Sequence, residues 1–346
     1  MSSELKVAFL SKELPSDRCN GVSVQVHRLA NALVKQGVRI TCYSFSPKPD
    51  RAGYDHVHLQ YGTANPVWKK IVPGIRFRSL KLSSCDIVHC HGDDYLRRGS
   101  PLRVRTFYGS ALNEALNARR FDRLARQGLF AAFEWVSCLR KGATVGISRT
   151  TKRSLPLIHR VIPCGVPLEI YTPGEKSPTP TVLFIGDFDS RKNGRAVLEA
   201  FHTTVREKVP GAILNVVGPR SCRGAGVRWL GTPEESLLVQ HYREAWVYCM
   251  ASTYEGFGVP LIEAMACGTP VVSVANAGAR EVVQHHYDGL LGTEDTLGEM
   301  LVRMLTDEGL RRRIADNGLR SVKRFDMTRV AGEYLSLYEN LVRIHT

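Results

Sequence analysis

The sequence contains no apolar run that approaches the roughly 20 residues a membrane-spanning helix needs, so we expect no membrane span. Its N-terminal stretch has an apolar core of only four residues, 7–10, which we expect to enter a strand rather than form a signal peptide. The nine cysteines are odd in number and include no C-x-x-C pair. This pattern argues against a disulfide framework and a zinc site, and it favours a reducing cytoplasm.

A dinucleotide-binding motif is also missing, because neither half of the chain carries G-x-G-x-x-G after a strand, and this argues against a nicotinamide-dependent oxidoreductase. What the sequence has is 346 residues with 43% hydrophobic and 23% charged content, typical of a globular protein of two domains. We expect domains at residues 1–165 and 166–328, with a helix at 329–346 that packs back towards the first domain.

Positive charge is concentrated in the first half of the chain. Residues 1–170 hold 27 Lys and Arg against 12 Asp and Glu, whereas residues 171–346 hold 20 against 21. The formal net charge of +14 therefore arises from one half, and any function assigned to the protein should account for it.

Hydrophobic patterns alternate between strands and helices in both halves. In the first half, residues 7–10 and 39–43 are predicted strands, and apolar residues on one helical face between them predict a helix that Gly37 ends. Further strands are predicted at residues 87–90, 104–107, 145–147, 182–186, 214–217, 246–250 and 271–274. This order predicts parallel, doubly wound α/β sheets, which bind ligands beyond the carboxyl ends of their strands.

The most informative segment is EGFGVPLIEAMACGTPVV, residues 255–272. Pro260 suits the first turn of a helix, and Gly268 followed by Thr-Pro closes that helix after about two turns. Glu255 is then expected in the loop before the helix and Glu263 in its first turns.

The same segment predicts the chemistry of its ligand. Gly256 and Gly258 let the backbone come close to a bound molecule, and the free amides at a helix start favour an anionic group. Carboxylates accept hydrogen bonds from hydroxyls, whereas amides donate to phosphate. A ligand that carries both groups is a nucleotide diphospho-sugar.

The segment resembles the E-x7-E signature of the retaining family 4 glycosyltransferases, which have the GT-B fold. The resemblance implies an α/β chain of two Rossmann-like doubly wound domains that face each other across a cleft. It also implies that Glu263 binds the ribose hydroxyls and that Glu255 lies near the donor sugar. Sugar hydroxyls or phosphate would be held by amides around the loop residues Gly256, Phe257, Gly258 and Val259.

The resemblance extends into the first half. Asn20-Gly21 matches a Gly-Gly element whose backbone approaches the donor diphosphate, and only Gly21 keeps the family identity. The stretch DIVHCHG matches a strand end on the acceptor side, where His89 or His91 could accept or relay a proton, and His91 is the catalytic candidate. In VRTFYGS, Tyr108 replaces a family His that contacts the donor sugar; a phenol can hydrogen-bond a hydroxyl but cannot carry a proton charge at neutral pH.

In the second half, VLFIGDFDSRKNG matches a loop in which the family uses an Arg and a Lys to hold the diphosphate. Lys192 falls on the Lys position, whereas Asp187 occupies the Arg position. Arg191 is a candidate to restore the second cation, although adjacent residues on a strand or helix point apart. Asp187 and Asp189 resemble a metal-binding D-x-D, which we interpret as a coincidence of a polar loop. Gly218, after a strand, matches a position near the nucleotide base.

Two basic clusters lie in the half that binds the acceptor in the GT-B fold. Residues 66–82 alternate apolar side chains with Lys and Arg and could lie on an anionic membrane surface. Pro73-Gly74 is expected to interrupt any continuous helix there, and the alternative is a solvated helix and loop. The second cluster is predicted to form a basic helix face and comprises Arg119, Arg120, Arg123 and Arg126. Together they imply an acceptor that is anionic or borne on a membrane.

The resulting prediction is a cytoplasmic or peripherally membrane-bound, metal-independent hexosyltransferase that needs no cofactor. UDP-sugars are favoured as donor, with GDP-mannose second. Three alternatives stay open. They are a GT-B-fold epimerase or phosphorylase, a non-catalytic relative that binds sugar nucleotides (suggested by Asp187 and Tyr108), and a nucleic-acid-binding protein. The last has only the net charge of +14 in its favour and lacks a recognition motif, so no nucleic-acid partner is expected.

Overall fold

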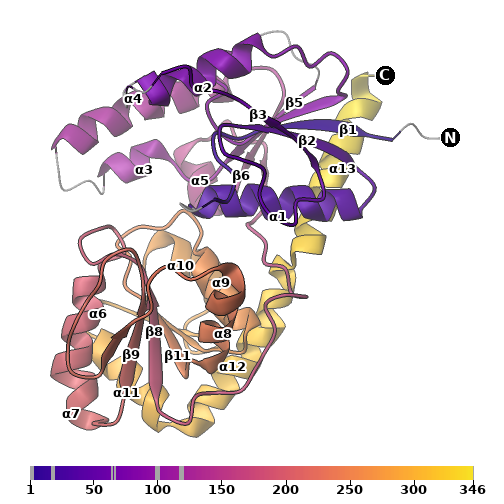
Figure 1. Ribbon diagram of the computed structural model, residues 1–346. Helices are drawn as coiled ribbons and strands as arrows, with labels where there is room; N and C mark the ends of the chain where they lie inside the picture. Colours follow the sequence, from indigo (N-terminus) through magenta and orange to yellow (C-terminus); the bar gives the residue numbers. More distant parts are fainter. Residues whose placement is uncertain are drawn as a thin grey trace. The chain divides into compact units, whose positions relative to one another are not determined.

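The computed structural model describes residues 4–16, 20–63, 65, 68–97, 102–116 and 121–345, without the side chains of residues 114–116, 121–127 and 129. The chain forms two compact units, of which the first comprises Met1–Gly165 with Met327–Thr346 and the second Val166–Asp326 (Figure 1). None of the described helices is long and apolar enough to cross a membrane.

A seven-stranded parallel sheet forms the centre of the first unit, in the order β3-β2-β1-β4-β5-β6-β7. Its strands are β1 (Lys6–Leu10), β2 (Arg39–Ser44), β3 (Asp55–His58), β4 (Ile87–Cys90), β5 (Leu102–Phe107), β6 (Ala143–Gly146) and β7 (Arg160–Val161). Its helices are α1 (Gly21–Lys35), α2 (Trp68–Ser79), α3 (Ala111–Leu116), α4 (Phe121–Cys138), α5 (Arg149–Ser154) and α13 (Met327–His345). The parallel pairing confirms the predicted strand–helix–strand order.

Helices cover both faces of this sheet. On one face α1 and α13 pack side by side, and Leu29 and Tyr334 join Phe9 in one buried cluster (Figure 1). On the other face, Phe77 of α2 packs with Leu10. Because successive residues of β1 point to opposite faces, the unit is doubly wound.

Local sequence signals define α1. The Asn20 side chain accepts a hydrogen bond from the Ser23 amide at 2.9 Å, and the Ser23 hydroxyl accepts one from the Asn20 amide at 3.2 Å, which forms a capping box. Gly37, with φ of 86°, follows the last turn as predicted.

The prediction that Pro73-Gly74 would interrupt a helix is wrong, because α2 runs through both residues. Proline removes one backbone hydrogen bond from a helix interior. Here Pro73, Gly74 and Phe77 are buried, and Gly74 lies against the ring of Tyr95, where a Cβ atom would come within 2.9 Å. Tertiary packing therefore outweighs the local preference.

The second unit contains a six-stranded parallel sheet in the order β10-β9-β8-β11-β12-β13. Its strands are β8 (Thr181–Ile185), β9 (Ile213–Val217), β10 (Val227–Trp229), β11 (Val247–Met250), β12 (Val271–Val274) and β13 (Leu290–Gly292). Its helices are α6 (Gly194–Ala200), continued by a π-helical turn (Phe201–Val205) and α7 (Arg206–Lys208), then α8 (Glu235–Glu244), α9 (Val259–Ala266), α10 (Ala277–Val282), α11 (Leu297–Thr306) and α12 (Glu308–Val322), followed by a 3-10 turn (Lys323–Phe325).

This sheet is also covered on both faces. Phe184 of β8 packs with Leu301 of α11 on one face, whereas Tyr242 of α8 contacts Tyr248 of β11 on the other. Because the strands are parallel, the loops that follow β8 and β11 leave the sheet at the same edge. This edge carries most of the residues that the sequence singled out.

Candidate functional site

The loop after β11 and the start of α9 have the predicted form. Gly258 precedes the helix with φ of 107°, Pro260 lies in its first turn, and Gly268, with φ of 66°, follows its end. Glu255 lies in the loop and Glu263 in the helix, as expected. Only glycine adopts the backbone of Gly258 without strain.

Two cations converge on Glu255 in the second unit. Nη1 of Arg191 lies 2.7 Å from Oε2 of Glu255, and Nζ of Lys192 lies 2.7 Å from Oε1. The expectation that neighbouring residues point apart does not hold, because Arg191 and Lys192 lie in the turn between β8 and α6 rather than in a strand or helix. The three side chains together carry one net positive charge.

Glu255 is ionised in this arrangement, with only 6% of its surface exposed. Burial alone would raise its pKa, but the charges and hydrogen bonds of Lys192 and Arg191 outweigh burial and lower the pKa from 4.5 to about 2. A lowered carboxyl pKa stabilises the fold fully above the ordinary value, and this contribution is lost as pH falls through 4.5 towards 2.

The stability of a Glu255→Gln variant should therefore depend on pH less than that of the wild type. At pH 7 we expect the variant to be less stable by about 3 kcal/mol, because two cations lose their buried carboxylate. The Tm difference should shrink as pH falls from 5 towards 3, measured by thermal melts. Glu299→Gln, which removes an exposed carboxylate paired with Lys208, is the control. A gap that stays constant with pH would contradict this account.

Backbone packing holds the loop that carries Glu255. A Cβ atom on Gly278, in α10, would lie 2.7 Å from both Cβ and the carbonyl oxygen of Glu255. Asn276 caps α10 and donates from Nδ2 to the Ser252 carbonyl at 2.8 Å. Phe257 is buried edge-on against Phe325, with ring centroids 5.4 Å apart. The loop is thus fixed from both sides, a requirement for a preorganised site.

The loop after Phe257 leads into the start of α9. Gly256 and Gly258 flank the buried Phe257 ring, and Val259 is the first residue of α9. The amides at the start of an α-helix lack partners within that helix and attract anions. This part of the loop is the anion-binding candidate of the second unit.

Glu263 is held from α8. Only 6% of its surface is exposed, and the hydroxyl of Tyr242 donates a hydrogen bond of 2.9 Å to its Oε2. No local sequence pattern indicates Tyr242, because it lies 21 residues earlier on another helix. Only the tertiary structure identifies this pair.

Gly218 is explained by packing alone. It follows β9, and a Cβ atom there would come within 2.3 Å of the Gly186 carbonyl oxygen at the end of β8. Its own carbonyl accepts a hydrogen bond of 2.9 Å from Nε1 of Trp229. A role in binding the base stays a prediction.

Both aspartates of the D-x-D spacing lie beside arginines. Asp189 accepts hydrogen bonds from Arg195 at 2.6 Å and Arg220 at 3.0 Å. Asp187 lies 3.8 Å from Nε of Arg220. No group of three His, Cys, Asp or Glu residues is placed to hold a metal ion within the described parts of the chain.

In the first unit, the structure brings His91 and Tyr108 together. Nδ1 of His91 lies 3.0 Å from the Tyr108 hydroxyl, and Nε2 of His91 is buried with no hydrogen-bond partner in the described part of the chain. Burial lowers the pKa of His91 well below its ordinary value and raises the pKa of Tyr108 well above its own. His91 is therefore neutral and Tyr108 protonated. The alternative, His89, is fully enclosed between Tyr338 and Thr106.

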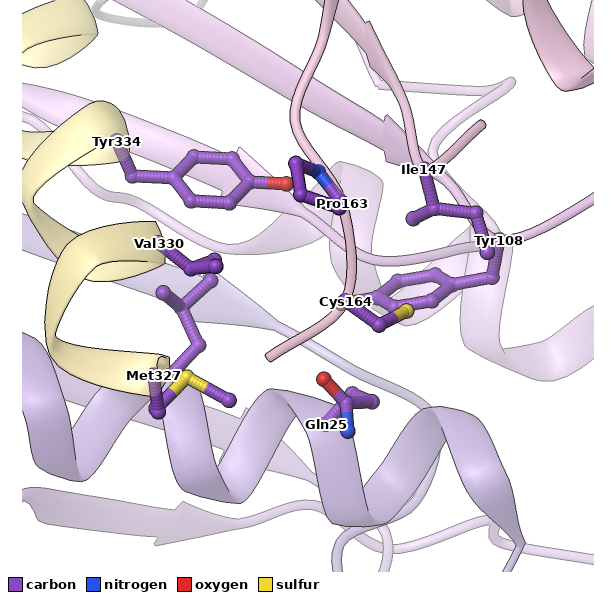
Figure 2. A pocket seen from close by; sticks show the side chains of 9 residues that line it. Gln25, Tyr108, Ile147, Pro163, Cys164, Met327, Val330 and Tyr334 are labelled. Atoms are coloured by element: carbon purple, nitrogen blue, oxygen red, sulfur yellow. The ribbon is translucent and has the colours of Figure 1, made fainter. Parts of the chain in front are cut away.

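Tyr108 also lines a small pocket of the first unit with Gln25, Cys164 and Tyr334 (Figure 2). The space enclosed by the pocket is only about 10 Å³. Ligand sites usually start at about 300 Å³, so we do not assign a sugar nucleotide to it.

The remaining sequence candidates of the first unit are Gly21 and the second basic cluster. Gly21 begins α1. Apart from its chain neighbours and the backbone of its own helix, no described residue has an atom within 4 Å of where its Cβ would be, so those residues do not require glycine there. Arg119 and Arg120 lie outside the described residues, as do the side chains of Arg123 and Arg126.

Comparison with known proteins identifies the family. The model for glycosyl transferases group 1 matches residues 170–321, and the model for glycosyltransferase family 4 matches residues 19–170. The phosphatidyl-myo-inositol mannosyltransferase of Mycobacterium leprae is 33% identical over 174 residues, which cover 46% of this chain and 46% of that protein. The chain thus spans about half the length of this curated relative.

Solved structures show the fold. A sucrose-phosphate synthase from Thermosynechococcus elongatus gives a TM-score of 0.81 at 21% identity, covering 99% of this chain and 100% of the other. HepE of Anabaena, solved with UDP and glucose, gives a TM-score of 0.74 at 15% identity, covering 96% of this chain and 99% of the other. Two parallel Rossmann-like units and these likenesses define a protein of the GT-B class. The chain belongs to the group 1 glycosyltransferases of family 4.

Proposed function

We propose that this protein is a retaining glycosyltransferase that moves a hexose from a nucleotide diphospho-sugar to an acceptor hydroxyl. The observation that carries the proposal is the convergence of Arg191 and Lys192 on Glu255 at 2.7 Å. This cluster lies at the edge where β8 and β11 end, within the segment that matches the group 1 model.

The net positive charge of this cluster suits a diphosphate. The donor's phosphate oxygens would share the two cations with Glu255, and Lys192 would neutralise the charge that develops as the diphosphate departs. Amides around Gly256 and Gly258 would add hydrogen bonds. Arg191 would take the place of the family arginine, which is Asp187 in this chain.

The configuration of the anomeric carbon is retained because the acceptor enters on the same face of the sugar that the leaving group departs from. The bond between the anomeric carbon and the diphosphate oxygen breaks through an oxocarbenium-like state. The acceptor oxygen then bonds to the same carbon, and its proton passes to the departing diphosphate. No metal is required, because cations and amides of the protein stabilise the leaving group.

The sugar and acceptor are finer parts of the proposal. HepE is described in complex with UDP and glucose, and the mycobacterial relative is named for mannose and phosphatidyl-myo-inositol. We therefore propose UDP-glucose and GDP-mannose as the leading donors. The basic first half and the inositol lipid of that relative support an anionic or membrane-borne acceptor.

A donor panel tests the proposal. Thermal shift with UDP, GDP, UDP-glucose and GDP-mannose should show one preferred nucleotide, and transfer from the matching sugar should persist in EDTA. Isomerised sugar formed without acceptor would support an epimerase instead. Binding without transfer to any acceptor in a library would support a non-catalytic relative. Absence of binding to every nucleotide would contradict the proposal.

The α2 surface supports a membrane partner. Trp68, Ile71 and Ile75 are exposed on this helix, with Trp68 at 53%. Exposed cations of the same segment are Lys70, Arg76, Arg78 and Lys81. Apolar side chains among cations are typical of a surface that binds anionic lipid.

Charge reversal on α2 should weaken binding to vesicles. The triple variant Lys70→Glu, Arg76→Glu, Arg78→Glu should lose at least about 100-fold in affinity for phosphatidylserine vesicles, since each cation near the membrane contributes about 1 kcal/mol. Vesicle flotation measures this affinity, with neutral phosphatidylcholine vesicles as the reference. The matched control reverses three exposed cations of the second unit, Lys208, Arg312 and Arg313. Equal loss in both triples would refute a specific α2 surface.

A further inference from the structure

A buried hydroxyl group holds Glu263, one of the two glutamates of the E-x7-E segment. Tyr242 is fully buried, and its hydroxyl donates to Oε2 of Glu263 at 2.9 Å. Burial, reinforced by the charge of Glu263, raises the pKa of Tyr242 well above its ordinary value, so the phenol remains a donor. We infer that Tyr242 is a positioning residue that orients the Glu263 carboxylate to accept hydrogen bonds from the ribose hydroxyls of the donor. This inference rests on the proposed function.

The support for Glu263 is itself rigid. The Thr269 hydroxyl donates to the backbone carbonyl of Tyr242 at 2.5 Å, and Lys176 donates to the Thr269 hydroxyl at 2.6 Å. The Tyr242 ring packs edge-on against that of Tyr248, with centroids 5.5 Å apart. Backbone and ring are therefore both fixed, so the position of the Tyr242 hydroxyl is determined by the fold.

Orientation matters at Glu263 because the terminal torsion of a glutamate is intrinsically broad. A pair of neighbouring ribose hydroxyls needs the carboxylate in one plane. A donor on one carboxylate oxygen restricts this rotation before the ligand arrives, which lowers the ordering cost of binding.

Tyr248 provides a matched control. It is a second fully buried tyrosine of the same aromatic cluster, and its hydroxyl has no hydrogen-bond partner among the residues that the structure describes. Tyr242→Phe and Tyr248→Phe thus each remove one buried hydroxyl from the same environment, but only the Tyr242 hydroxyl donates a hydrogen bond to Glu263.

The experiment compares nucleotides with and without ribose hydroxyls. Calorimetry with UDP and GDP identifies the nucleotide that the wild type prefers, and its 2′,3′-dideoxy form is the probe. Tyr242→Phe should weaken binding of the ribonucleotide by about tenfold, as expected for a lost hydrogen bond to a charged group. Its affinity for the dideoxy form should stay within about twofold of the wild type. The KM of the donor should rise while kcat changes little. Tyr248→Phe should leave the affinity for both nucleotides unchanged.

A double-mutant cycle keeps the test sharp if Tyr242→Phe also loses stability. In a Glu263→Ala background, which has no side-chain acceptor for the Tyr242 hydroxyl, Tyr242→Phe should add no further loss of affinity for the ribonucleotide. Equal weakening of both nucleotide forms, or an unchanged ribonucleotide Kd in Tyr242→Phe while Glu263→Ala loses binding, would overturn the positioning role alone. A wild type that binds neither UDP nor GDP would overturn the proposed function and this inference with it.

Discussion

Lys192→Ala is expected to lower kcat by about 100- to 1,000-fold, the usual effect of removing one group that stabilises developing negative charge. Donor KM should change only a few-fold, because Arg191 and the amides after Glu255 still hold the ground-state diphosphate. Lys192 is the candidate for this role because its Nζ lies 2.7 Å from the Glu255 carboxylate at the strand-end edge. Steady-state kinetics with saturating acceptor measure both constants.

The control for Lys192 is another lysine of the same unit that also makes an ion pair. Lys208 contacts Glu299 at 2.5 Å on the exposed surface. Lys208→Ala removes the same charge and a similar pair, so it should leave kcat unchanged. A wild-type kcat in Lys192→Ala would remove our account of leaving-group stabilisation, while leaving the nucleotide-binding proposal open.

Glu263→Ala is expected to weaken nucleoside diphosphate binding by about 100-fold, because two hydrogen bonds between hydroxyls and a charged group are lost. The loss should show in Kd and KM more than in kcat, since the ribose contact is the same in the ground and transition states. Isothermal calorimetry measures it directly.

Two further variants make the Glu263 result interpretable. Alanine leaves the buried Tyr242 hydroxyl without its acceptor, so Glu263→Gln, which keeps a carbonyl oxygen, separates folding from binding. Glu299→Ala removes an exposed carboxylate of the same unit, and this variant should bind the nucleoside diphosphate as tightly as the wild type. If Glu263→Ala binds the nucleotide as tightly as the wild type, this glutamate does not hold the ribose.

Local signals explain why part of the site could be predicted from sequence. In the segment from Glu255 to Gly268, glycine and proline determine where the helix starts and stops. The placement of both glutamates could therefore be predicted from neighbouring residues in the sequence. The buried strands were equally readable because parallel strands are continuous apolar runs, as at residues 87–90.

Contacts between distant elements explain what could not be predicted. The convergence of Arg191 and Lys192 depends on the path of a turn, which adjacent positions in the sequence do not reveal. The helix through Pro73 depends on burial against Tyr95. Short edge strands such as β3, with its sequence DHVH, carry no apolar run to mark them. Tyr242 became visible only when α8 and α9 were placed together.

The position of α13 has a consequence for biosynthesis. Its Tyr338 hydroxyl lies 2.6 Å from Nδ1 of His89, and Tyr334 lies 2.9 Å from the Thr106 hydroxyl, all within the buried interior of the first unit. These residues leave the ribosome after the whole second unit. The second unit can therefore complete its core during translation, whereas the first unit has one sheet face covered only in part, by α1, until α13 emerges. Nascent chains arrested before α13 should engage chaperones through that face.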